Sequence, residues 1–191
     1  MRAKTILSLF KYFATLGFST RPTTRGLCWL AILLSTARGL VAVVTTSSPI
    51  VISTNDRLIW ATNVSADTVS VLRPDINSVL ATIPVGDEPQ SIALTPDGQY
   101  AYVANAASNN VTVIRINDPA WGTFSAQVDM TAGVNGHITT GAEPWNIVCS
   151  PDGNRVFVAN SQQDTVTVIN TATRGVIGHV HLRPDPFARD D

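Results

Sequence analysis

The sequence predicts an all-β protein built from about three four-stranded antiparallel sheets, and three observations support this prediction. A strand-like segment recurs three times, ending at Asn63, Asn105 and Asn160, and a second run rich in valine and threonine follows each copy. Apolar and polar residues alternate with a period of two in these runs, as in a strand. The turn sequence Pro-Asp-Gly stands at residues 96–98 and 151–153. Strand-like repeats of 42 to 55 residues are typical of the blades of a β-propeller.

The second repeat shows how one copy would form a four-stranded blade. Residues 90–95 alternate as an innermost strand A, and residues 96–98 turn the chain, because proline fixes φ and glycine accepts a positive φ. Strand B is expected over residues 100–105, and strand C, which is rich in β-branched side chains, over residues 110–115. Strand D is expected near residues 124–130. The asparagine that ends each strand B is expected to bond loop backbone.

The first and third repeats follow the same plan. Residues 54–57 replace the Pro-Asp-Gly turn in the first repeat, which fits a terminal blade because terminal repeats are usually atypical. Strand D is expected over residues 79–84 in the first blade and 176–181 in the third, and an insertion in the second blade is expected around residues 118–137. The expected blade core is Ile92, Leu94, Val103, Val111, Val113, Ile147, Val158, Val166 and Val168.

Three blades do not close a ring, because propellers have typically four to eight blades. We therefore expect an incomplete ring or a truncated propeller that needs further blades. The predicted organisation is a signal peptide or membrane anchor at residues 1–44, a linker at 45–48, repeats at 49–88, 89–143 and 144–183, and a C-terminal tail at 184–191.

Residues 1–44 have the features of an export leader. All six basic residues before Asp56 lack an acidic counterpart, and an apolar run over residues 27–37 follows Arg25. A basic segment followed by a short apolar run is typical of a signal peptide. If Arg38 is tolerated, residues 26–44 could remain as a membrane anchor. The prediction is an extracytoplasmic protein, periplasmic, secreted or on the cell surface, that meets a membrane only if the leader is retained.

The rest of the chain is acidic. From Asp56 onward, 14 acidic residues face seven arginines and no lysine. A nucleic-acid surface needs a basic stripe to neutralise phosphates, so this composition argues against a nucleic-acid partner. After cleavage of the leader, Cys149 would be the remaining cysteine, so no intrachain disulfide is expected, and a small buried apolar role is predicted for this side chain.

Short motifs in all three repeats resemble a known family. Residues 102–105 (Tyr-Val-Ala-Asn), 157–160 (Phe-Val-Ala-Asn) and 60–63 (Trp-Ala-Thr-Asn) are similar to the tetrapeptide of the YVTN-type β-propeller repeat family. The companion sequence Gly-x-Glu-Pro stands at residues 86–89 and 141–144. The resemblance implies a propeller fold. It leaves function open, since such propellers serve as binding platforms, surface-layer proteins and domains of redox enzymes.

The sequence offers no catalytic constellation. His179 and His181 would lie on one face of a strand, but two ligands are too few for a metal site. There is no Cys-x-x-Cys-His for haem, no Gly-x-Ser-x-Gly nucleophile elbow and no glycine-rich phosphate loop. The prediction is therefore no catalytic residue, no metal and no cofactor, and a protein that is not an enzyme is favoured.

The loops between strands D and A, and between strands B and C, form the predicted ligand-binding face. Glu88 and Glu143 both precede a proline at the start of an innermost strand, where they could form an acidic ring or bond loop backbone at a turn. Trp145 offers an aromatic platform beside them, or packs at the channel mouth. The predicted ligand-binding residues are Asp87, Glu88, Gln90, Glu143, Trp145, Gln162 and Asp164.

Two functions are compatible with these observations. The first is an exported, non-enzymatic propeller segment that binds a protein, a polysaccharide or a small ligand through its loop face. The alternative is the propeller portion of a periplasmic redox enzyme or of a lactonase-like hydrolase whose catalytic part lies outside this chain.

Overall fold

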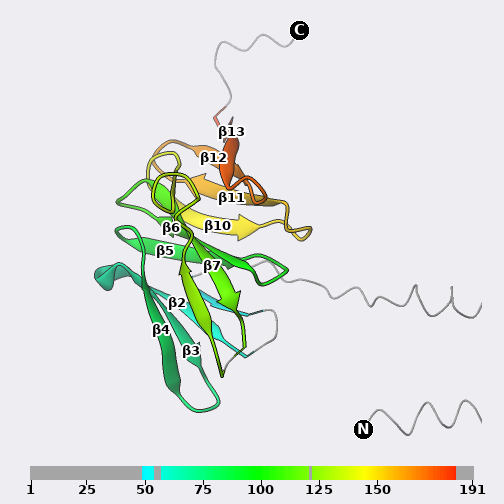
Figure 1. The fold of residues 1–191 in the computed structure, drawn as a ribbon. Coiled ribbons are helices and arrows are strands. Elements are labelled where there is room, and N and C mark those ends of the chain that lie inside the picture. The colour runs from blue at the N-terminus through cyan, green and yellow to red at the C-terminus, as the bar shows by residue number, and fades with distance from the viewer. Residues whose placement is uncertain (1–48, 54–56, 121, 184–191) are drawn as a thin grey trace, which may run out of the picture. The chain divides into compact units, whose positions relative to one another are not determined.

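The computed structural model describes residues 49–53, 57–120 and 122–183 and shows three antiparallel sheets (Figure 1). The predicted leader, linker and tail lie outside these residues. Each sheet follows one sequence repeat, which confirms the predicted all-β class and the three blades. No helix in the described part is long and apolar enough to cross a membrane.

Blades 1 and 3 each consist of four strands that pair in chain order. Blade 1 contains β1 (Ile50–Ile52), β2 (Ile59–Asn63), β3 (Thr68–Arg73) and β4 (Ser78–Pro84), with a single 3₁₀ turn at Val64–Ala66. Blade 3 contains β10 (Pro144–Cys149), β11 (Arg155–Asn160), β12 (Thr165–Asn170) and β13 (Gly175–His181). We call the end with the D–A and B–C loops the loop face, and the end with the A–B and C–D turns the turn face.

Blade 2 differs from the prediction in its outer strand. It contains β5 (Pro89–Leu94), β6 (Tyr100–Asn105), β7 (Asn110–Asp118), β8 (Ser125–Val128) and β9 (His137–Thr139). The single strand D expected near residues 124–130 is two short strands, because β8 pairs with the second half of β7 and β9 with the first half. The insertion between them includes Gly133 and Gly136, whose positive φ values let the chain leave the sheet and return.

The hydrophobic core lies between neighbouring blades. One cluster joins blades 1 and 2 and includes Trp60, Val69, Val71, Ile92, Val103 and Ile114. A second cluster joins blades 2 and 3 and includes Ala93, Tyr102, Ala104, Val111, Val113, Ile147, Cys149, Val156, Val158 and Ile169. Blade 2 is therefore covered on both faces, as the run of four buried residues 111–114 shows.

Three of the predicted core residues are not fully buried. Leu94 lies at the edge of its cluster, and Val166 and Val168 are half-buried. The last two lie on the face of blade 3 that no other sheet covers within the described residues, whereas Val111 and Val113, at the same repeat positions, are fully buried under blade 3. Burial at this position depends on a neighbouring blade, and the repeat itself cannot determine that.

The strand-B asparagine joins strands B and C through side chains, which corrects the expected bond to loop backbone. Nδ2 of Asn160 donates to Oγ1 of Thr165 at 2.9 Å and to Oγ1 of Thr167 at 2.8 Å. The amides of Asn63 and Asn105 donate to side-chain oxygens at the equivalent strand-C positions, which are Thr68 and Ser70 in blade 1 and Asn110 and Thr112 in blade 2. Because all three described blades repeat this geometry, we assign the asparagine a structural role that links strands B and C.

Gly86→Ala should destabilise the protein by roughly 1–3 kcal/mol, the usual cost of overpacking a dense interior. A Cβ on Gly86 would lie 2.7 Å from Nδ2 of Asn105, and the backbone N–H of Gly86 already donates to Thr112 at 3.1 Å. Urea unfolding measures the change. Gly122→Ala is the matched control, because a Cβ there has no neighbour within 4 Å. Equal stability of the two variants would contradict this account.

Candidate functional site

The backbones of the two predicted glutamates are held in an unusual conformation on the loop face. Glu88 and Glu143 have left-handed φ values of 54° and 55°, which residues other than glycine adopt uncommonly. The N–H of Glu88 donates to Oδ1 of Asp67 at 3.0 Å, and the N–H of Glu143 donates to Oδ1 of Asn109 at 2.8 Å. Each D–A loop is therefore bonded to the B–C loop of the preceding blade. It is the amide of the glutamate, rather than its carboxylate, that supports the loop.

The two carboxylates differ in how firmly they are held. Oε2 of Glu143 accepts a hydrogen bond from Oγ of Ser161 at 3.1 Å, and the main chain of Ser161 donates to the carbonyl of Glu143 at 2.9 Å. Blade 2 has Ala106 at the position of Ser161, so only the backbone contact to Glu88 is repeated, at 2.9 Å. The side chain of Glu88 is exposed. One carboxylate is thus fixed and the other is open to solvent.

The remaining predicted residues lie at the same end of the blades. The pairing of the innermost strand with its neighbour shifts register at Gln90 in blade 2 and at Trp145 in blade 3. Trp145 is 46% exposed. Oγ of the buried Ser91 donates to the carbonyl of Trp145 at 2.9 Å and joins the innermost strands of blades 2 and 3. Trp145 therefore combines a fixed backbone with an exposed indole ring.

Backbone N–H groups stabilise the loops at this end of the blades through hydrogen bonds. The N–H of Asp87 donates to Oγ of Ser108 at 2.6 Å, and the N–H of Gln162 donates to the carbonyl of Ala142 at 3.4 Å. The carboxylate of Asp164 lies 2.5 Å from Nε of Arg183. The structure places all seven predicted residues at the loop face.

A cavity of about 440 Å³ lies at the turn face, between blades 2 and 3. Its walls come from both A–B turns and from the hairpin between β12 and β13, and they include Asp97, Tyr100, Asp152, Asn154, Thr171 and Arg174. The Ser150 hydroxyl, followed by the N–H groups of Asn154, lowers the pKa of Asp152 to about 2. Oδ1 of Asp97 likewise accepts bonds from Thr95 at 2.5 Å and from the N–H of Gln99 at 3.0 Å. Both carboxylates accept hydrogen bonds within their Pro-Asp-Gly turns.

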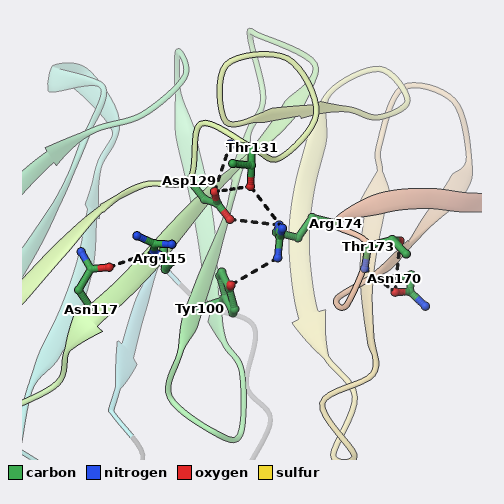
Figure 2. A network of polar contacts seen from close by, with 8 residues as sticks. All are labelled: Tyr100, Arg115, Asn117, Asp129, Thr131, Asn170, Thr173 and Arg174. Atoms are coloured by element: carbon green, nitrogen blue, oxygen red, sulfur yellow. Dashed lines mark hydrogen bonds and ion pairs between the residues drawn. The ribbon is translucent and has the colours of Figure 1, made fainter.

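Arg174, which lines this cavity, joins blade 3 to the insertion of blade 2. Figure 2 shows its contacts with Asp129 and Thr131. Its Nε lies 3.1 Å from Oδ2 of Asp129, and its guanidinium stacks 5.6 Å from the centre of the Tyr100 ring. Its Nη2 also lies 3.3 Å from Oγ1 of Thr131. Burial raises the pKa of Asp129. The hydrogen bonds from the hydroxyl and N–H of Thr131, together with the charge of Arg174, lower it by more, so the pKa is below its usual value. Sequence reasoning missed this pair because neither side chain recurs in the other repeats.

The histidines take part in the framework of the blades. Nδ1 of His137 lies 3.0 Å from Oγ1 of Thr112, and Nδ1 of His179 lies 3.1 Å from Oγ1 of Thr167. These threonines are the ones that the strand-B asparagines contact. Within the described ranges, no three His, Cys, Asp or Glu side chains gather closely enough to hold a metal ion. Burial raises the pKa of the Cys149 thiol to about 11, so this cysteine is protonated at neutral pH.

Comparison with known proteins shows the family. Residues 33–132, more than half of the chain, match the lactonase family of seven-bladed β-propellers. The three blades and the inter-blade core agree with this match. The chain belongs to this family.

Individual relatives are considerably longer than this chain. A seven-bladed β-propeller protein of Mycobacterium tuberculosis is 31% identical over 102 residues, which cover 53% of this chain and 24% of the relative. Hydrazine synthase subunit beta of Kuenenia stuttgartiensis is 50% identical over 48 residues, covering 23% of this chain and 12% of that subunit. The solved structure of Kuenenia stuttgartiensis hydrazine synthase aligns with a TM-score of 0.59 at 27% identity, over 73% of this chain and 38% of that one. The chain spans less than a third of the length of the curated relatives it matches.

Proposed function

We propose that this chain supplies three blades, with repeats of the YVTN type, to a lactonase-type propeller that binds a small polyhydroxylated lactone on the loop face. The observation that carries the proposal is the repeated pair Glu88 and Glu143. Both have their backbones fixed by a neighbouring blade, and the carboxylate of Glu88 is exposed. A carboxylate on a rigid loop can accept hydrogen bonds from sugar hydroxyls with little loss of entropy.

The family supports the choice of ligand class. Carboxylates at the mouth of the channel would bind hydroxyl groups, and the half-exposed indole of Trp145 would lie against the apolar face of a sugar ring. Hydrolysis of a lactone also needs a base that activates water and a donor that stabilises the developing oxyanion. Glu88 is the exposed carboxylate suited to the first role. The donor would come from further blades that complete the channel.

A second candidate is a non-catalytic platform in a redox assembly. It is favoured by the 50% identity over 48 residues to a subunit of hydrazine synthase. In this case the loop face would contact a protein rather than a small molecule. Both candidates agree with an extracytoplasmic location, which the basic and acid-free leader over residues 1–44 supports.

Glu88→Gln combined with Glu143→Gln should weaken binding of δ-gluconolactone at least tenfold. Each hydrogen bond to a charged group contributes about 1.5–3 kcal/mol, and the amide keeps the size of the side chain. Isothermal titration calorimetry on the full chain measures the affinity.

Asp75→Asn is the matched control for this pair of substitutions. Asp75 is an exposed carboxylate at the turn face of blade 1, where it pairs with Arg73 at 2.8 Å. The control should bind as the unmodified protein does. Unchanged affinity in the double variant would contradict the site, and a chain that does not bind the lactone at millimolar concentration would leave the platform as the better candidate.

A further inference from the structure

We infer that His137 and His179 are positioning residues for the two loops that carry the predicted glutamates. Those loops contain Glu88 and Glu143. Each histidine is a neutral ring that accepts a hydrogen bond from the threonine hydroxyl beside it, and this hydroxyl in turn holds the backbone of the glutamate loop. The effect of the histidines on a ligand rests on the proposed function, whereas their hydrogen bonds can be measured without a ligand.

The hydroxyl of Thr112, which is fully buried, has three polar neighbours. The N–H of Gly86 donates to Oγ1 of Thr112 at 3.1 Å. Nδ2 of Asn105 donates to the same oxygen at 2.8 Å, and Nδ1 of His137 lies 3.0 Å from it. A hydroxyl has two acceptor lone pairs and one hydrogen to donate. Because Gly86 and Asn105 use both lone pairs, the hydrogen of Thr112 points to His137.

This arrangement determines where the hydrogen of the His137 ring lies. Nδ1 needs a free lone pair to accept from the hydroxyl, so the ring is neutral and its hydrogen is on Nε2. The amide of Asn105 must then donate, and a second contact agrees, since Nδ2 also donates to Oδ1 of Asn110 at 2.7 Å. The opposite orientation of this amide would bring two oxygens to that distance without a hydrogen between them.

Blade 3 repeats the same three contacts. Oγ1 of Thr167, which is fully buried, lies 2.8 Å from Nδ2 of Asn160 and 3.1 Å from Nδ1 of His179. The N–H of Gly141 donates to the same oxygen at 3.4 Å. In blades 2 and 3 alike, the histidine pairs with its threonine across strands C and D. The hydroxyl of each threonine therefore joins a histidine to the start of a glutamate loop.

Blade 1 has neither the histidine nor the glutamate. Ser70 occupies the threonine position of its strand C, and it pairs with Thr82 where blade 2 has His137. The first repeat also has Ser-Pro at residues 48–49, where the later repeats have Glu-Pro. Blade 1 nevertheless forms the same four strands. The histidine is therefore linked to the glutamate loop rather than to the formation of a blade.

The threonine contact is the best shielded of three successive backbone contacts in the loop of residues 86–88. The three N–H groups donate in order to side-chain oxygens of Thr112, Ser108 and Asp67. Thr112 is fully buried, whereas Ser108 and Asp67 are half-buried. A hydrogen bond away from water is the stronger one. If the histidine is lost, the hydroxyl can rotate, and the loop should open more often.

His137→Leu removes the acceptor, and His137→Asn restores it, because Oδ1 of asparagine is bonded to Cγ as Nδ1 of histidine is. In the full chain, the amide of Gly86 should exchange with solvent roughly tenfold faster in the leucine variant and at the unmodified rate in the asparagine variant. Nuclear magnetic resonance measures these rates. The amides of β5 and β6 should exchange as before, which a general loss of stability would not allow.

His179→Leu is the matched control in the other blade. It should speed exchange of Gly141 and leave Gly86 at the unmodified rate. His179 is exposed, so this variant keeps the test decisive if His137→Leu does not fold. In the unmodified chain at about pH 8, where an ordinary histidine is neutral, nitrogen–proton spectra should show the hydrogen of His137 on Nε2.

A hydrogen on Nδ1 of His137 would overturn the inference, and so would unchanged exchange of Gly86 in the leucine variant. Calorimetry with δ-gluconolactone tests the link to the ligand, because the affinity should fall in His137→Leu and recover in His137→Asn. Equal affinity of the leucine variant and the unmodified chain would show that the histidine does not position Glu88. If the unmodified chain does not bind the lactone, the proposed function fails, and the exchange rates still decide the role of the histidine.

Discussion

Val113→Asp should prevent folding, whereas Val168→Asp, the same substitution in the next repeat, should leave a folded chain. Val113 is fully buried between blades 2 and 3 and pairs with Tyr102 across the sheet. A carboxylate there would lack a partner, at a cost of several kcal/mol that rivals the whole stability of a domain. Val168 lies on the face of blade 3 that no other described sheet covers, and it is half-buried. The carboxylate of an aspartate at this position can therefore reach water.

Far-ultraviolet circular dichroism and urea unfolding of both variants measure this contrast. The Val113 variant should show no cooperative transition, and the Val168 variant should retain one. Val113→Ala is a milder control that removes volume without adding charge, and it should unfold cooperatively at lower urea. A cooperative transition in the Val113→Asp protein would contradict the burial of this strand between two sheets.

This contrast also shows what the sequence could predict. Strands A to C of blade 2 and strand D of blades 1 and 3 were predicted from period-two alternation and turn residues, and the structure has strands at these positions. Val113 and Val168 have identical neighbours in their repeats, so no local pattern distinguishes their burial. That difference arises from tertiary packing, because a third blade covers Val113 and no described segment covers Val168. The outer strand of blade 2 escaped prediction for a related reason, since its insertion has no counterpart in the other repeats.

The sequence indicated where on the blades the candidate residues lie, but it did not indicate which hydrogen bonds hold them. The recurrence of glutamate before proline indicated the loop face for Glu88 and Glu143. The sequence did not reveal that their amides bond to Asp67 and Asn109, because those contacts join residues of different blades. It also gave no sign that Ser161 holds one carboxylate, because blade 2 has an alanine at that position. Pair contacts across blades depend on geometry that one repeat does not encode.

Arg174→Met should lower the free energy of unfolding by about 2–3 kcal/mol at pH 7. Breaking a buried ion pair from one side costs about 3–5 kcal/mol, and the 24% exposure of the Arg174 side chain reduces this figure. The variant leaves the 6% exposed carboxylate of Asp129 with the Thr131 hydrogen bonds and the charge of Arg115, and it also removes the contact over the Tyr100 ring. Arg115→Met is the comparison variant, because this exposed arginine bonds to Asn117 on the same strand and acts on Asp129 only through its charge, so its loss should cost about 0.5 kcal/mol or less (Figure 2).

The pH dependence of the same variant separates the ion pair from simple packing. Because the folded protein holds the pKa of Asp129 below the usual 3.8, the carboxylate stabilises the fold above that pH and loses this contribution as the pH falls through the folded pKa. Without Arg174 the guanidinium no longer lowers the pKa, so the variant should lose the contribution of Asp129 at a higher pH. Urea unfolding at pH 7 and at about pH 3 should therefore give a stability difference that shrinks in acid. A difference that stays constant between these pH values would assign the effect to lost packing on Tyr100, since a stacking contact does not depend on the ionisation of Asp129.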